Sequence, residues 1–269
     1  MSARSTMLLA SAVVMFMANA ASASMMSVDL GSEYLKVALI KPGRTPISIV
    51  VNEMTRRKSP ALVGVVKGER LLGEEAFSLS VRYPDFIYTR IRDLLGKPAS
   101  DPSLHRMLQA QSLPFKVVPH SPERPTAAVQ GTDGSVHSAE ELVASLLQYA
   151  RGIAEAQSGA PVPDAVVAVP PFFGQAQRQA LQDAAQLAGV NLMGIINSNT
   201  AAALQFGIEK DFADKTQHVI FFDLGSGSTI ASLVKYSSYE AKEAGKPKAI
   251  SQLEVQEVEW DELCGSNNL

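Results

Sequence analysis

Two short segments, separated by most of the chain, carry the residue types that bind phosphate. Asp29-Leu30-Gly31-Ser32 lies near the start, and Asp223-Leu224-Gly225-Ser226 repeats it near the end. Glycine allows a turn to adopt a positive φ and lets backbone amides approach phosphate oxygens closely. The aspartate before each turn can bind Mg²⁺ or its water ligands. This chemistry suits a nucleotide bound through its phosphates.

Each segment can also be interpreted as an ordinary β-hairpin, because Asp-x-Gly turns are common. A single copy favours that simpler interpretation. The two copies are matched, however, and each follows an apolar segment typical of a strand. A repeat over this distance indicates a duplicated unit with two similar lobes that face one cleft. The pair therefore favours a nucleotide site, with the two turns gripping a triphosphate from both sides.

Strands and helices mixed in α/β fashion must position these turns. Apolar and β-branched segments predict strands over residues 27–30, 34–40, 47–51, 59–66, 115–118, 166–169, 191–196, 218–222, 229–236 and 250–260. Helical spacing predicts helices over residues 73–81, 85–95, 174–187 and 200–206. A further long helix follows the capping box Ser138-Ala139-Glu140-Glu141. Residues 98–135, rich in Pro, Ser and Gly, are expected to form a loosely ordered excursion around the strand at 115–118.

Composition limits the class of protein. The 269 residues can form one or two domains, and 46% apolar with 19% charged residues is an ordinary globular composition. A net charge of -3 argues against binding to nucleic acid or an anionic membrane, since both require a basic surface. The only cysteine is Cys264, so no internal disulfide can form.

The first residues have the pattern of a secretory signal peptide. Arg4 precedes the short apolar segment 7–17, and small residues at A-x-A spacing follow, so cleavage is expected between about Ala20 and Ser24. A membrane anchor is the alternative, but this segment is shorter than the roughly 20 residues that span a bilayer. The end of the chain carries no retrieval signal of the Lys-Asp-Glu-Leu type and is expected to be an interruption.

Three segments of the sequence resemble one known family. They are VDLGSEYLKVALIKPG (Val28 to Gly43), VAVPPFFGQAQRQALQDAAQLAGVNLMGIINSNTAAALQFG (Val167 to Gly207) and VIFFDLGSGSTIASLVKY (Val219 to Tyr236). The chain resembles the nucleotide-binding domain of heat-shock-70 chaperones from about Ser27 to Trp260. The resemblance implies the actin-like ATPase (ribonuclease H-like) fold, an α/β fold with duplicated lobes, of which the second is incomplete here.

Two further features resemble the large branch of this family that works in the endoplasmic reticulum lumen, the hypoxia-up-regulated, glucose-regulated chaperones. They are the Asp-Leu-Gly-Ser-Glu turn, and Asn52-Glu53 followed by Arg57-Lys58-Ser59-Pro60. The signal peptide agrees with this location. The resemblance divides the chain into a signal peptide (1–23), a first lobe (24–210, with an insertion subdomain over about 55–137) and the start of a second lobe (211–269).

The resemblance also assigns residues to ATP and Mg²⁺. The implied nucleotide contacts are Asp29, Gly31, Ser32, Asp223, Gly225, Ser226, Gly227 and Ser228, and the two aspartates are the implied Mg²⁺ ligands. No catalytic residue is assigned, because several positions depart from the family. Phe77 occupies the position of the family's catalytic lysine, Ser198 that of a glutamate, Ile230 that of an aspartate and Glu33 that of a threonine. Glu33 either repels the phosphates or turns outward to cap a backbone amide.

The function expected from these residues is an ATP-binding chaperone of the stress response that assists protein folding in the endoplasmic reticulum lumen. Its expected partners are unfolded client proteins and the standard chaperone of that compartment, for which it would act as a nucleotide-exchange partner. Neither nucleic acid nor membrane is expected. Lost charges at the γ-phosphate predict weak or no hydrolysis. Two alternatives stay open, namely an active ATPase or small-molecule kinase of the same fold, and a nucleotide-free scaffold fragment.

Overall fold

The computed structural model describes residues 24–41, 47–111, 113–208, 210, 212, 215–243 and 246–267. The expected signal peptide lies outside the described residues. Within them, no helix has both the length and the apolar character needed to cross a membrane.

A central sheet carries the first turn. Its strands are β1 (Met25–Leu30), β2 (Tyr34–Ile40), β3 (Ile47–Ile49), β4 (Ser59–Pro60), β11 (Asp164–Val169) and β12 (Asn191–Asn197), in the order β12-β11-β1-β2-β3 with β4 also paired to β2. β1 is antiparallel to β2 and parallel to β11. Alternate residues of β1, namely Met26, Val28 and Leu30, are buried, as expected for a strand with one face on the core. The end of β1 is therefore held on both sides.

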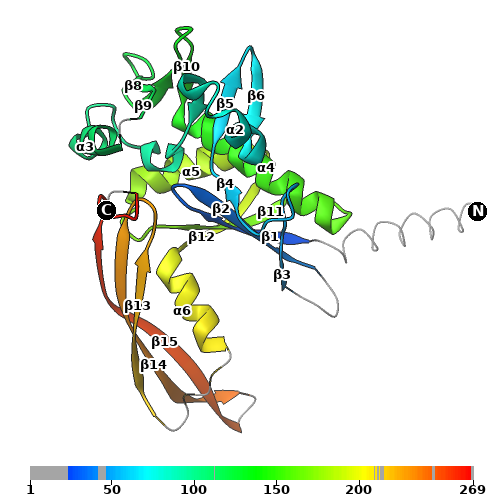
Figure 1. Cartoon of the computed structure of the whole chain (residues 1–269). Helices are drawn as coiled ribbons and strands as arrows, with labels where there is room; N and C mark the ends of the chain where they lie inside the picture. Colours follow the sequence, from blue (N-terminus) through cyan, green and yellow to red (C-terminus); the bar gives the residue numbers. More distant parts are fainter. Residues whose placement is uncertain are drawn as a thin grey trace, which may run out of the picture.

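Two long helices cover this sheet on one side (Figure 1). They are α4 (Ala139–Ser158) and α5 (Gln175–Leu187). The predicted capping box starts α4: the Glu141 amide donates to Ser138 Oγ at 3.2 Å, and the Ser138 amide donates to Glu141 Oε2 at 2.9 Å. Gly189 follows α5 with a φ of 65°, the left-handed conformation that glycine adopts readily after a helix. Both helices were predicted correctly.

The segment between β4 and α4 departs from the predictions in part, although the helix predicted over 73–81 and the strand predicted over 115–118 are found. It contains β5 (Val63–Val66), β6 (Glu69–Leu72), α2 (Gly73–Leu79), β7 (Ile87–Tyr88), α3 (Pro102–Gln111), β8 (Lys116–Pro119), β9 (Ala127–Gln130) and β10 (Val136–Ser138). The predicted helix over 85–95 is wrong. Two short 3₁₀ helices, Pro84–Phe86 and Ile91–Leu94, flank β7 there, because β7 pairs with β5 and Arg90 adopts a left-handed φ of 57°. Residues 98–135 are also more ordered than expected, since they form α3 and most of a three-stranded sheet.

The second turn belongs to a separate antiparallel sheet, formed by β13 (Gln217–Leu224), β14 (Thr229–Glu243) and β15 (Lys246–Asp261). Helix α6 (Ser198–Ile208) packs on one face of this sheet (Figure 1). Asn199 Nδ2 donates to Ser232 Oγ at 3.0 Å, and the Tyr236 hydroxyl donates to the carbonyl of Ala203 at 2.7 Å. The helix that follows the central sheet thus fixes the second sheet as well.

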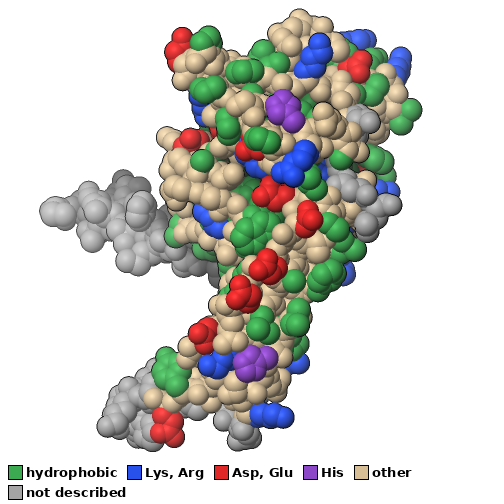
Figure 2. Space-filling model, turned by 90° about the vertical axis from the view of Figure 1, so that its left-hand side faces the viewer, with side chains coloured by type: hydrophobic (Ala, Val, Ile, Leu, Met, Phe, Trp, Pro, Cys, Tyr) green, Lys and Arg blue, Asp and Glu red, His purple; other side chains and the backbone are tan. Residues whose placement is uncertain are grey.

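The opposite face of the second sheet is open. Ile220 and Phe222 of β13 are 69% and 68% exposed, as expected, whereas Leu233 of β14, which was expected to be exposed too, is half-buried. Glu257 and Glu259 of β15 are exposed on the same face. Figure 2 shows apolar and acidic side chains next to one another over this part of the molecule.

Candidate phosphate-binding site

The two repeated turns have the same backbone geometry. In the first, the Gly31 amide donates to the carbonyl of Tyr34 at 3.0 Å, and in the second the Gly225 amide donates to the carbonyl of Ser228 at 2.9 Å. Each turn joins two antiparallel strands, β1 to β2 and β13 to β14. The sequence repeat is therefore also a structural repeat.

Close packing, rather than a positive φ, explains the first glycine. The prediction of a positive φ at the turn glycines is wrong, since none of Gly31, Gly225 and Gly227 has a positive φ. A Cβ added at Gly31 would collide with the carbonyl of Tyr34, the acceptor of the turn's own hydrogen bond. A Cβ at Gly225 would lie 3.2 Å from the carbonyl of Ser228. The turns are tight enough to exclude larger side chains at position 31 and to crowd them at 225.

Both turns line one cavity of about 310 Å³. All eight residues that the resemblance assigned to the nucleotide line it: Asp29, Gly31, Ser32, Asp223, Gly225, Ser226, Gly227 and Ser228. The cavity also brings in residues that sequence reasoning did not assign to a site, among them Lys36, Lys58, Arg92 and Ser266. Residues from both ends of the chain thus meet at one concave surface.

The aspartate of the first turn affects the pKa of the aspartate of the second turn. Asp29 Oδ2 lies 2.7 Å from Lys36 Nζ, in an ion pair that solvent reaches. Solvent also reaches Asp223, yet partial desolvation and the nearby charge of Asp29 raise the pKa of Asp223 above its ordinary value. Among the described residues, no cluster of three or more acidic, His or Cys side chains could hold a metal. Two carboxylates fit Mg²⁺ nevertheless, because this ion keeps waters and phosphate oxygens in its shell.

Ser32 is engaged with a buried ion cluster beside the first turn. Its Oγ accepts a hydrogen bond from Arg92 Nη2 at 2.5 Å and lies 3.4 Å from Asp93 Oδ1, to which it donates. Arg90 Nε also donates to Asp93, at 2.8 Å. The hydroxyl that was expected to contact phosphate is therefore already bound to other side chains.

The charges in this cluster determine the pKa of Asp93. Burial alone would raise the pKa of Asp93, but the charges of Arg92 and Arg90 and the hydrogen bonds from Arg92 and Ser32 lower it to about 2. The aspartate is thus ionised at neutral pH and holds two arginines at the edge of the site.

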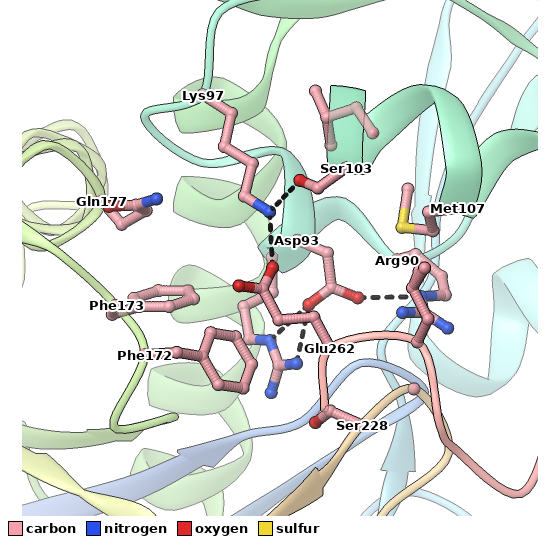
Figure 3. Close-up of a pocket in the computed structure, with 14 residues that line it drawn as sticks. Arg90, Asp93, Lys97, Ser103, Met107, Phe172, Phe173, Gln177, Ser228 and Glu262 are labelled. Atoms are coloured by element: carbon pink, nitrogen blue, oxygen red, sulfur yellow. Dashed lines mark hydrogen bonds and ion pairs between the residues drawn. The ribbon is translucent and has the colours of Figure 1, made fainter. Parts of the chain in front are cut away.

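A smaller cavity, of about 30 Å³, lies between the ion cluster of Arg90, Arg92 and Asp93 and the segment 262–263 (Figure 3). Lys97 Nζ is 3.0 Å from Glu262 Oε2 and donates to Ser103 Oγ at 2.9 Å. A Cβ at Gly227 would collide with the guanidinium of Arg90. The second turn is therefore packed directly against the segment that carries the ion cluster.

The segment after β15 joins the two turns. The amides of Ser266 and Asn267 donate to the carbonyls of Gly225 and Ser226 at 2.9 and 3.2 Å. Asn267 Nδ2 also donates to Glu33 Oε2 at 3.3 Å. Glu33 lines the cavity and accepts this hydrogen bond from a side-chain amide rather than from the backbone amide expected for it, and its repulsion of the phosphates stays a prediction.

Three positions that depart from the family lie in different places. Ser198 and Ile230 line the 310 Å³ cavity. Ser198 Oγ is buried and has no hydrogen-bond partner among the described residues, and Ile230 is 3% exposed opposite Asp223. Phe77 is half-exposed and lines another cavity, which it shares with Tyr34 and Glu33. Phe77 therefore lies beside the first turn, in a neighbouring cavity that shares Glu33 and Tyr34 with the 310 Å³ cavity, and it does not line the 310 Å³ cavity itself.

Comparisons with known proteins show one family to which the chain is similar. The Hsp70 protein family matches residues 25–242. The chain is 45% identical to heat shock 70 kDa protein 17 of Arabidopsis thaliana, over 91% of this chain and 28% of that protein. It is 39% identical to hypoxia up-regulated protein 1 of Homo sapiens, over 90% of this chain and 24% of that protein. The corresponding protein of Xenopus laevis is also 39% identical, over 91% of this chain and 37% of that protein.

The chain spans about a quarter of the length of the first two relatives. The mixed α/β architecture and the family match confirm the expected fold, the actin-like ATPase fold of an Hsp70 nucleotide-binding domain. The hypoxia-up-regulated relatives bear out the expected branch. The chain therefore belongs to the Hsp70 family.

Proposed function

We propose that this chain binds Mg²⁺-ATP between the two repeated turns, as part of an ATP-binding chaperone. One observation carries the proposal: two turns with the same glycine hydrogen bond line a single cavity, and each contributes an aspartate. Family membership agrees with it.

The residues that line the cavity suit both Mg²⁺ and the phosphates of ATP. Asp29 and Asp223 would hold Mg²⁺ or its waters, and bound Mg²⁺ would neutralise part of the phosphate charge. The backbone of the turns and the hydroxyls of Ser226 and Ser228 would contact phosphate oxygens. The buried, unpartnered Ser198 Oγ is a further polar group at the cavity wall.

We further propose that hydrolysis is weak or absent. Ser198 and Ile230 line the cavity where charged groups are expected from the resemblance, and neither is a general base at neutral pH. Phe77 cannot replace a lysine, because it carries no charge and lines a different cavity. Without these charges, stabilisation of the transferring phosphoryl group is reduced.

The domain division and the location are part of the same proposal. Residues 24–210 would form a first lobe with the central sheet, and residues 211–269 the start of a second lobe. The pattern of residues 1–23 supports a signal peptide and the endoplasmic reticulum lumen. In that compartment the protein would assist unfolded clients and act as a nucleotide-exchange partner of another chaperone.

Calorimetric titration of the full chain with ATP tests the nucleotide proposal. We expect binding with a stoichiometry of one in the presence of Mg²⁺ and much weaker binding after the metal is chelated. If neither condition gives binding, the cavity is not a nucleotide site and the scaffold alternative is favoured.

A further inference from the structure

The charged groups of the 310 Å³ cavity are unequally paired. Three cations line it, namely Lys36, Lys58 and Arg92. Lys36 is 2.7 Å from Asp29. The Arg92 guanidinium is buried, lies 2.7 Å from Asp93 Oδ1 and also donates to the carbonyl of Leu30 at 3.0 Å. These two cations are therefore already bound to protein acceptors.

Lys58 differs from them. Among the described residues, no carboxylate lies within 4.0 Å of its amine. The amine instead lies over the ring of Tyr34, 4.1 Å from the ring centroid. An exposed contact between a cation and an aromatic ring is weaker than a charge-assisted hydrogen bond to phosphate. The ammonium of Lys58 can therefore be drawn to an anion in the cavity.

The backbone of Lys58 is fixed next to the first turn. Its carbonyl accepts from the buried Asn52 side chain at 3.4 Å, and the next residue, Ser59, begins β4. β4 pairs with β2 at Tyr34 and Leu35, directly after the turn. The lysine thus has a well-positioned main chain and a side chain that reaches the cavity, which suits a ligand contact.

We propose that Lys58 binds the terminal phosphate of the nucleotide. This inference rests on the proposed nucleotide site. The Tyr34 ring holds the ammonium at the cavity before the ligand arrives. Because Tyr34 also accepts the hydrogen bond of the first turn, the lysine and the turn are positioned by the same residue.

Titration of the full chain with Mg²⁺-ATP and Mg²⁺-ADP tests this role. Lys58→Met should weaken ATP binding about tenfold or more, the equivalent of one lost charge-assisted hydrogen bond. ADP binding should change far less, because the terminal phosphate is absent, and Lys58→Arg should retain most of the ATP affinity. Arg57→Met is the matched control, since Arg57 is the exposed neighbour and does not line the cavity. It should leave both affinities unchanged.

The outcomes separate the two proposals. If the unsubstituted chain binds ATP and Lys58→Met binds it equally well, the role of Lys58 is overturned and the nucleotide site stands. Equal losses of ATP and ADP would overturn the assignment to the terminal phosphate. If the unsubstituted chain binds neither nucleotide, the site itself is refuted, and Lys58 with it. The thermal unfolding midpoint of Lys58→Met should change only slightly, because the substitution removes no more than an exposed contact between the amine and the Tyr34 ring.

Discussion

At the scale of single residues, two aspartates have pKa values shifted in opposite directions: the pKa of Asp223 in the cavity is raised, and the pKa of Asp93 beside it is lowered to about 2. The raised pKa of Asp223 means that its charged form is disfavoured in the folded protein. A raised carboxyl pKa makes folding less favourable above that pKa, and protonation relieves the penalty as the pH falls through it. Bound Mg²⁺ would reverse the effect by favouring the charged form.

Asp223→Asn should therefore separate stability from binding. Without ligand, the variant should unfold at a slightly higher temperature at pH 7, because it removes the disfavoured charge. Its affinity for Mg²⁺-ATP should fall at least tenfold, or about 1.4 kcal/mol. For the unsubstituted chain, affinity should decrease as the pH falls through the raised pKa. Asp183→Asn, a change on α5 outside the cavity, is the control. Lower stability together with unchanged affinity would contradict this role.

Asp93 has the opposite dependence on pH. Its lowered pKa stabilises the fold above the ordinary aspartate value, and this stabilisation is lost as the pH falls toward 2. The shift corresponds to roughly 2 kcal/mol. Asp93→Asn should cost about 3 kcal/mol at pH 7, because two buried arginines lose their partner.

Urea unfolding at pH 7 and at about pH 2.5 measures this effect. The difference between the unsubstituted chain and Asp93→Asn should shrink at the lower pH. A difference of the same size at both values would show that the cluster does not depend on the ionised carboxylate.

At the scale of elements, periodicity predicted those that pack on a large core. The strands β1, β2 and β11 and the helices α4 and α5 were found close to their predicted bounds, because one face of each is continuously apolar. The capping box also specified the start of α4. Local sequence was sufficient where burial and local hydrogen bonding agree.

Prediction failed where distant pairing determines the structure. The segment 85–95 has a helical pattern, yet Tyr88 pairs with Val63 of β5 and Arg90 adopts a left-handed conformation beside Asp93. The sequence around 85–95 contains no pattern that indicates a pairing with a strand elsewhere in the chain. The ion cluster and Lys58 were missed for the same reason, although the charged runs 56–58 and 90–93 were visible in the sequence.

The two turns of the candidate site were predictable because their motif repeats. Their meeting at one cavity depends on elements far apart in the chain, among them α6, which packs on the second sheet. The duplicated-lobe interpretation anticipated a common cleft. The bridge from Asn267 to Glu33 was not predictable, because it joins residues at opposite ends of the described chain.

Asn199 tests the link between α6 and the second sheet. Its buried side chain donates to the carbonyl of Phe221 at 3.2 Å and to Ser232 Oγ. Asn199→Ala should lower the free energy of unfolding by about 1 to 3 kcal/mol, because buried acceptors lose their partner. Asn191→Ala on β12 removes an exposed hydrogen bond to Asp164 Oδ1 and should cost less, about 0.5 kcal/mol, because solvent replaces that bond. If chemical denaturation gave the same loss of unfolding free energy for both variants, the link between α6 and the second sheet would not contribute to stability.

At the scale of the whole molecule, the second sheet exposes both an apolar face and an edge strand. Ile220 and Phe222 lie on β13, which is at the edge of its sheet. Exposed edges and apolar patches promote association between chains. We therefore expect the 269-residue chain to self-associate with increasing concentration, and limited proteolysis to remove residues beyond about 211 first.

Sedimentation velocity tests this expectation with matched variants. Ile220→Lys combined with Phe222→Lys should shift the chain toward the monomer. Val81→Lys should leave the association unchanged, because Val81 is an exposed apolar residue (94%) that does not belong to this sheet. A chain that stays monomeric and protease-resistant at all concentrations would contradict the expectation.

The central claim is that two repeated turns form one nucleotide site, and a double-mutant cycle on Asp29 and Asp223 tests it most directly. The measurement is the Mg²⁺-ATP affinity of the full chain, of Asp29→Asn, of Asp223→Asn and of the double variant. We predict that each single change weakens binding at least tenfold. The losses should be non-additive by more than about 0.5 kcal/mol, because both carboxylates act on one metal–nucleotide complex. Strictly additive losses, or a single variant with unchanged affinity, would contradict a shared site.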